Sequence, residues 1–117
     1  MKQDVLSRLF FAGFVRLHIL HHAAEAAICG VDIVAELGRH GYRLSPGTVY
    51  PVLHDLENAG YLRASSAVVA GKMRKYYGAT RAGKTALTQA RKKLRELAEE
   101  VLEPRPARRK GRKQSAP

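Results

Sequence analysis

Residues 45–60 constrain the fold more than any other part of the chain, because they contain a full set of signals for one short helix. Ser45 is a residue type that caps helices, and Pro46 suits the first helical position, where a missing N–H costs nothing. The apolar residues that follow have the spacing i, i+3, i+4 and i+7: Val49, Val52, Leu53 and Leu56. Gly60 supplies the stop. These residues therefore predict a short amphipathic helix with one buried face.

The opposite face of this helix is expected to be exposed. It presents Gly47, Tyr50, Pro51, His54 and Asn58, and none of these would repel a phosphate. Pro51 complicates the prediction, because a proline inside a helix removes a hydrogen bond and clashes with the preceding turn. Either the helix is kinked there, or Thr48 is the true cap and Pro51 lies in the first turn.

A β-hairpin is predicted directly after this helix. Residues 61–63 and 67–69 form one strand, Ala70 and Gly71 the turn, and residues 73–77 the returning strand. Lys72, Arg74 and Lys75 crowd the tip and one edge, where they could reach phosphates or a minor groove. The alternative is a solvated edge that is charged to prevent strand aggregation.

The charge distribution favours a polyanionic partner. The chain has a formal charge of +11, of which residues 1–102 contribute +6 and residues 103–117 contribute +5. No acidic residue lies between Glu57 and Glu96. The basic residues of that interval are Arg63, Lys72, Arg74, Lys75, Arg81, Lys84, Arg91, Lys92, Lys93 and Arg95. A long field of one sign points to nucleic acid. A small helix followed by a basic hairpin is how winged-helix proteins hold DNA.

Two further helices are predicted before this region. Residues 4–23 are apolar at helical spacing, and Phe11, Val15 and Ile19 widen the stripe beyond what one core face requires. A partner subunit is the expected cover for such a helix. Gly30 opens a second helix, which ends at Gly41.

A last helix, capped by Thr80, is predicted to run to about Leu102. Its apolar seam has steps of three and four, but at about two heptads it is too short for a coiled coil alone. Packing against the first helix of a second subunit would bury both surfaces, which predicts a two-fold dimer. The expected dimer contacts are Leu6, Phe10, Phe14, Leu87, Leu94, Leu97 and Val101.

The fold class expected from these elements is mainly α with a small β-hairpin, built on one core in 117 residues. A winged helix-turn-helix domain would occupy residues 1–79, a dimerisation helix residues 80–102, and a disordered basic tail residues 103–117. Cys29 is the only cysteine, which fits a reducing compartment and a packing role. The apolar stretches are too short to cross a bilayer and no signal peptide is recognised, so a cytoplasmic protein is expected.

A specific resemblance rests on three segments: GYRLSPGTVYPVL at residues 41–53, LENAGYL at 56–62 and GKMRKYY at 71–77. Together they resemble the PadR family of bacterial transcriptional regulators, in its short subgroup with a single C-terminal helix. The resemblance covers about residues 6–102. It implies a winged helix-turn-helix, a dimer formed through the first and last helices, and usually repression of nearby promoters.

The family's DNA-contacting positions fall on the predicted recognition helix and wing. They are Ser45, Pro46, Gly47, Thr48, Tyr50 and Pro51 in the helix, and Lys72, Arg74 and Lys75 in the wing. The residues suit this assignment, since Gly47 allows a close backbone approach and two hydroxyls can donate to a phosphate oxygen. His54 could touch a base edge, and a plain exposed histidine is the alternative.

The sequence fits other functions less well. An enzyme is not expected, because no catalytic set and no Gly-rich phosphate loop is recognised. A sequence-independent architectural DNA binder is the alternative suggested by the charge. No cofactor is predicted. A metal could be held by His18 with His21 or His22, completed by Cys29 or Glu25, although packing is the commoner role of such histidines. The family resemblance also allows a small hydrophobic effector.

Overall fold

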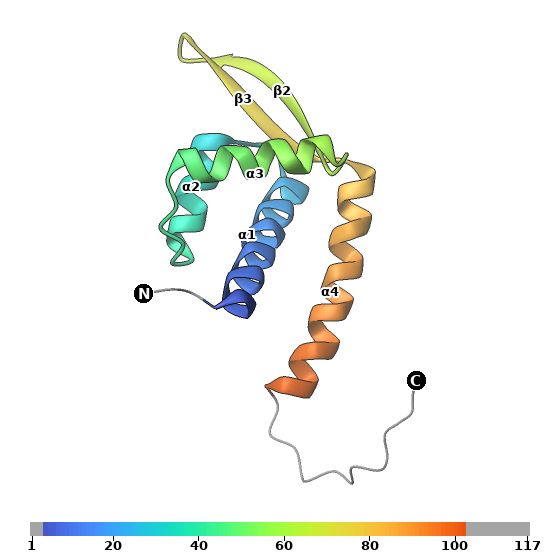
Figure 1. Cartoon of the computed structure of the whole chain (residues 1–117). Helices are drawn as coiled ribbons and strands as arrows, with labels where there is room; N and C mark the ends of the chain where they lie inside the picture. The colour runs from blue at the N-terminus through green and yellow to red at the C-terminus, as the bar shows by residue number, and fades with distance from the viewer. Residues whose placement is uncertain (1–3, 103–117) are drawn as a thin grey trace, which may run out of the picture.

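The computed structural model describes residues 4–102, so the basic tail predicted at residues 103–117 lies outside the described residues. Within them the chain forms four helices and a three-stranded sheet (Figure 1). The elements in chain order are α1 (Val5–Glu25), β1 (Ile28–Cys29), α2 (Gly30–Arg39), α3 (Pro46–Asn58), β2 (Leu62–Val69), β3 (Lys72–Ala79) and α4 (Arg81–Val101). This is the predicted class, mainly helical with a hairpin.

Capping residues mark the ends of the three N-terminal helices. Asp4 caps α1 by accepting a hydrogen bond from the Ser7 N–H at 2.7 Å, and α1 ends two residues later than predicted. Gly41, just past α2, has φ +90°, as its predicted capping role requires. α3 begins at Pro46 after Ser45 and continues through Pro51. Ser45 rather than Thr48 is therefore the N-cap residue.

The hairpin is formed by β2 and β3, and its turn explains the sharp reversal. Ala70 and Gly71 have φ values of +52° and +78°, the pair of positive angles found in two-residue turns whose twist matches that of the flanking strands. Val69 pairs with Lys72 on either side of the turn. β1 was not predicted. It adds two residues to the other edge of β3, where Ile28 faces Tyr77 and Cys29 faces Tyr76.

The core lies where α1, α2 and α3 meet the base of the sheet and the start of α4. Its fully buried members include Ile19, Ile33, Leu37, Leu53 and Tyr77. The core side of α1 comes from the C-terminal half of that helix, so Val15 and Ile19 are core residues and not the surplus that the sequence indicated. The surplus apolar surface lies at the N-terminal end of α1, where Leu6 and Leu9 are exposed.

α4 is fixed to the body by its first turn. The Thr80 hydroxyl accepts from the Gly83 N–H at 3.0 Å and donates to the Gly60 carbonyl at 2.6 Å. The Thr80 N–H donates to the Tyr61 carbonyl at 3.0 Å. Gly83 lies so close to Tyr61, the residue before β2, that a Cβ built on it would clash with the Tyr61 carbonyl oxygen. The junction between β3 and α4 is therefore tightly specified.

Replacing Gly83 by alanine should destabilise the fold by about 3 kcal/mol, at the upper end of typical overpacking costs. The obstructing atom is a backbone oxygen that already accepts a hydrogen bond, so it cannot rotate away. Thermal unfolding should show Tm lower by more than about 10 °C. Gly38→Ala is the matched control, because a Cβ at this helical glycine would meet nothing within 4 Å and should stabilise the fold slightly. Equal Tm values for the two variants would contradict the close contact.

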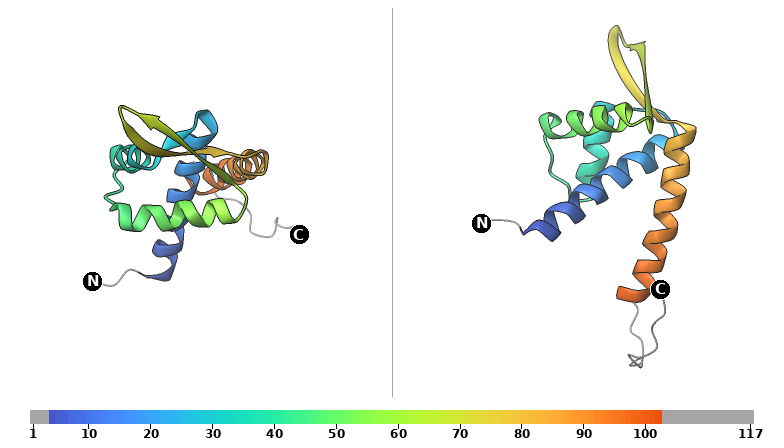
Figure 2. Two further views of the ribbon diagram at one scale, coloured as in Figure 1. Left: turned by 90° about the horizontal axis from the view of Figure 1, so that it is seen from above. Right: turned by 45° about the vertical axis from the view of Figure 1, so that its right-hand side comes forward.

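The elements are arranged with two distinct ends. α3 and the hairpin lie at one end, and α1 and α4 extend away from it and diverge toward the opposite end (Figures 1 and 2). Among residues 4–102, no helix is long and apolar enough to span a membrane.

Candidate nucleic-acid interface

The first turn of α3 is open to solvent. Ser45, Pro46, Gly47 and Thr48 are all exposed. Ser45 makes no side-chain hydrogen bond to the backbone of the helix that it caps, and its hydroxyl lies 3.4 Å from that of Thr48. The two hydroxyls therefore form a pair at the positive end of the helix dipole. This arrangement suits an anionic oxygen such as a phosphate.

The exposed face of α3 continues from this turn toward its C-terminus. Pro51 and His54 are exposed, in agreement with their predicted position. Asp55 is exposed too, and helical geometry places it four residues after Pro51 on the same face. The expectation that this face holds no acidic group is therefore wrong. The acid stands in the C-terminal half of α3, so the N-terminal half is the part suited to phosphate.

Tyr50 differs from the other predicted contact residues of α3 because it is partly buried. Its ring covers the start of α2: a Cβ on Gly30 would lie 2.4 Å from a ring carbon. Tyr50 also packs against the core cluster that contains Tyr77, and burial, followed by Glu57 and Tyr50, raises the pKa of Tyr77. Much of the Tyr50 ring is thus used for packing between α3 and α2, and Tyr50 also borders a groove that Lys72, Arg74 and Lys75 help to line.

The basic residues of the wing divide between two faces. Side chains alternate along a strand, so Lys75 shares a face with the buried Tyr77, and Lys72 and Arg74 point to the other. The ammonium of Lys75 lies 5.8 Å from the centroid of the Tyr77 ring. All three residues nevertheless lie on one strand, β3, and their side chains are divided between its two faces. Lys72 and Lys75 are exposed and Arg74 is partly buried.

The predicted dimer surface lies at the opposite end of the molecule from the wing. Leu6 and Phe10 on α1 are 77% and 54% exposed, and Leu97 on α4 is 52% exposed. Leu94 and Val101 are exposed as well, and Phe14 is half-buried. Leu87 differs, because it is 4% exposed and belongs to the protomer's own core. Leu87 therefore packs mainly within its own protomer and reaches the surface only where it lines the hollow between α1 and α4.

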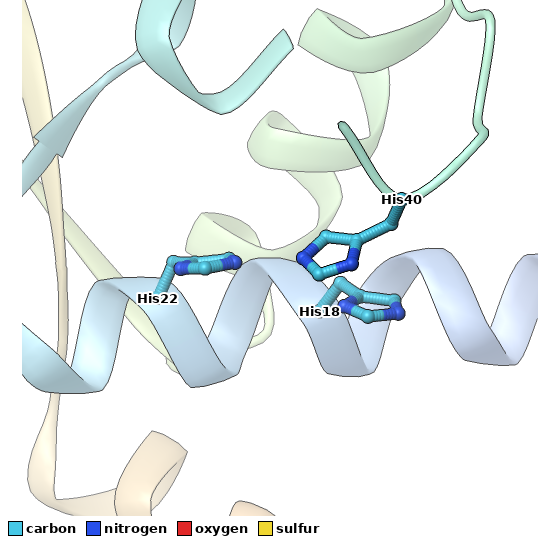
Figure 3. Close-up of side chains that lie close together, drawn as sticks. All are labelled: His18, His22 and His40. Atoms are coloured by element: carbon cyan, nitrogen blue, oxygen red, sulfur yellow. The ribbon is translucent and has the colours of Figure 1, made fainter. Parts of the chain in front are cut away.

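Three histidines gather on the side of α1 that faces α2 (Figure 3). His18 and His22 come from α1, and His40 is the C-cap residue of α2. The sequence did not reveal His40, because it is distant in the chain. Burial, followed by His40 and His22, lowers the pKa of His18 below its ordinary value. Cys29, which was considered as a further ligand, instead directs its thiol toward a carboxylate oxygen of Asp32 at 3.2 Å.

Comparison with known proteins places these features in one family. The model of the transcriptional regulator PadR-like family matches residues 19–89. Transcriptional regulator Rv3488 of Mycobacterium tuberculosis is 55% identical over 95 residues, which are 81% of this chain and 89% of that protein. A PadR-like transcription factor of Bacteroides fragilis superposes with a TM-score of 0.73 at 26% identity, covering 84% of this chain and 96% of the other. A PadR family transcriptional regulator of Eggerthella lenta superposes with a TM-score of 0.69 at 27% identity, covering 84% of this chain and 89% of the other.

Proposed function

The chain belongs to the PadR-like family of transcriptional regulators, and we propose that it binds operator DNA as a two-fold dimer and represses nearby promoters. Regulators of this family bind DNA and are typically dimeric, and they are not enzymes. The observation that carries the proposal is the open first turn of α3, with its pair of hydroxyls, at the same end of the molecule as the basic wing. Two binding elements on one end can engage one stretch of duplex.

The division of labour follows from the chemistry of each element. The first turn of α3 presents the Gly47 N–H and the hydroxyls of Ser45 and Thr48, which suit phosphate oxygens. Pro51 and His54 lie further along the exposed face, where His54 can meet a base edge in a major groove. Lys72, Arg74 and Lys75 extend the positive surface along the duplex. In this arrangement Tyr50 packs between α3 and the start of α2, and only the outer edge of its ring can contact DNA.

The dimer is proposed to form where α1 and α4 diverge. Between them lies a mainly apolar hollow of about 220 Å³ that Phe14, Leu17, Leu87 and Leu94 help to line. The apolar side chains of the N-terminal half of α1 and the C-terminal half of α4 continue this surface to the far end. A helix of a second copy fits these requirements, because it carries the same kind of apolar stripe. A small hydrophobic effector would compete with the partner's side chains for this hollow.

Footprinting of fragments selected from random genomic DNA tests the proposal. A dimeric regulator should protect discrete two-fold symmetric sites, with half-sites separated by about 10 base pairs or a multiple of that spacing. The architectural alternative, which the charge of +11 supports, would give protection without a preferred site. A reporter placed behind a selected site should then lose expression when the protein is present. A gain of expression would contradict the repressor assignment.

A further inference from the structure

We propose that His18, His22 and His40 form a binding site for a divalent transition-metal ion, with zinc as the representative ion. Each of the three side chains offers one ring nitrogen, and these nitrogens all lie within 4.8 Å of one another. Imidazole is the most common protein ligand for such ions. The site would join α1 to α2, the two helices that hold the histidines.

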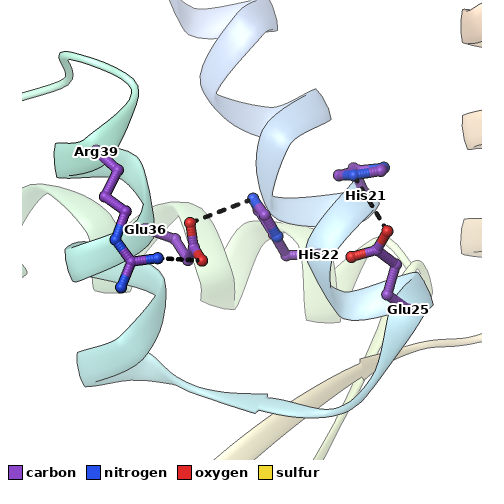
Figure 4. A network of polar contacts seen from close by, with 5 residues as sticks. All are labelled: His21, His22, Glu25, Glu36 and Arg39. Carbon is purple, nitrogen blue, oxygen red and sulfur yellow. Dashed lines mark hydrogen bonds and ion pairs between the residues drawn. The ribbon is translucent and has the colours of Figure 1, made fainter.

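The two helices present their candidate ligands in the same way. His18 and His22 are one turn apart on α1, at the spacing that puts two side chains on one helix face. Across from them, Glu36 and His40 are also four residues apart, and a Glu36 carboxylate oxygen is 3.9 Å from the His22 Nε2 (Figure 4). Glu36 is therefore positioned to act as a fourth ligand or to orient His22. Three imidazoles with a carboxylate or water make a zinc-type donor set.

His22 provides an observation that packing does not explain. Its Nε2 atom is buried and makes no hydrogen bond within the described residues. A buried polar atom without a partner is costly, and each such atom in a native structure calls for a cause. Aromatic packing accounts for His18, whose ring stacks on that of His40 at 4.6 Å between centroids and meets Tyr42 edge-on. It does not account for the unpaired nitrogen of His22, which a metal ion would use.

The distances require only a small adjustment. Zinc–nitrogen bonds of about 2.0–2.1 Å in a tetrahedral site place ligand nitrogens about 3.3 Å apart. The rings must therefore approach by on the order of 1 Å. His40 is exposed at the end of α2, so rotation about its side-chain bonds can supply this movement.

A second group of side chains near the same helix has a weaker claim. His21, His22 and Glu25 also lie close together. Both ring nitrogens of His21 are engaged, however: Nδ1 is 3.3 Å from the Arg91 guanidinium and Nε2 is 3.5 Å from Glu25. Arg91 adds a positive charge that disfavours a cation at this position. The two groups share His22, so variants of His21 and His40 distinguish them.

Calorimetric titration of the untagged full chain with zinc tests the site. One ion per chain should bind, Tm should rise in its presence, and cobalt should give visible absorption of nitrogen-rich coordination. Losing a residue that only holds a metal ligand in place costs about 10–100-fold in metal affinity, so loss of a ligand in His40→Gln should weaken zinc binding at least about a hundredfold. His40 is exposed, so this variant should fold, which circular dichroism would verify. The matched control His21→Gln should bind zinc like the unaltered chain.

Three results would overturn the proposal. They are the absence of saturable binding at about 0.1 mM zinc, undiminished affinity in His40→Gln, and loss of affinity in His21→Gln alone. The last result would assign the ion to the group formed by His21, His22 and Glu25.

Discussion

A chain carrying Leu94→Asp is expected to sediment as a folded monomer at concentrations where the unaltered chain is a dimer. Leu94 is 42% exposed in the protomer, so a carboxylate there can reach water as long as no partner covers it. In the proposed dimer it would face the partner's α1. Burying a polar group without a hydrogen bond costs about 2 kcal/mol at the low end of the usual range. Two-fold symmetry doubles this to about 4 kcal/mol, which is about a thousandfold in the dimer dissociation constant.

The matched control for this experiment is Gln89→Asp. Gln89 is exposed on the same helix and does not line the hollow between α1 and α4, so this variant adds the same charge without touching the proposed contact. It should remain a dimer. Analytical ultracentrifugation and circular dichroism of both variants give the assembly state and the integrity of the fold. A Leu94→Asp chain that stays dimeric with native helicity would exclude this part of α4 from the interface.

The features that the sequence predicted well depend on short-range chemistry. Ser45 with Pro46 set the start of α3, and Ala70 with Gly71 set the hairpin turn, because capping and turn geometry involve residues that are adjacent in the chain. Pro51 was ambiguous for the same reason. The sequence around Pro51 shows that an internal proline destabilises the helix, but it does not show what compensates. The helix continues through Pro51 because Leu53 and Leu56, which follow it, pack in the core.

The features that the sequence did not reveal depend on contacts between distant residues. β1 is two residues long and forms because Ile28 pairs with Tyr77 on β3. Two residues are too few to show the alternation of apolar and polar side chains that predicts a strand. Likewise Tyr50 looked exposed, because its contact with Gly30 crosses from α3 to α2. The apolar stripe of α1 also does not reveal that the other elements cover only the C-terminal half of this helix.

The same distinction applies to the candidate sites. The exposure of Ser45, Thr48 and Pro51 follows from a helical wheel once the buried stripe is known. Asp55 could have been placed on that face by the same reasoning, since it lies one turn after Pro51. His40 could not have been joined to His18 and His22 from the sequence, because the end of α2 meets α1 only through tertiary packing.

Replacing Lys72, Arg74 and Lys75 together by alanine should weaken DNA binding on the order of a hundredfold or more at 0.1 M salt. Each lost phosphate contact should make the plot of log affinity against log salt shallower by about 0.9. Three lost contacts therefore make the slope shallower by about 2.7. If both proteins bind equally weakly at about 1 M salt, this difference amounts to a loss of affinity of more than about a hundredfold at about 0.1 M. Fluorescence anisotropy at several salt concentrations measures both quantities. The dimer should persist, because the wing lies at the end of the molecule opposite the N-terminal end of α1 and the C-terminal end of α4.

Two comparisons give this result its meaning. Alanine at Lys92, Lys93 and Arg95 removes the same charge from exposed positions on α4, and it should leave the slope nearly unchanged. If this control changes the slope as much as the wing variant does, the wing makes no contact beyond the general attraction of a basic protein. Separate variants of the two wing faces then show how the hairpin lies on DNA. Because Lys75 shares a face with Tyr77, a loss confined to Lys75→Ala would place that face against the duplex, whereas a loss confined to the paired change at Lys72 and Arg74 would place the opposite face there.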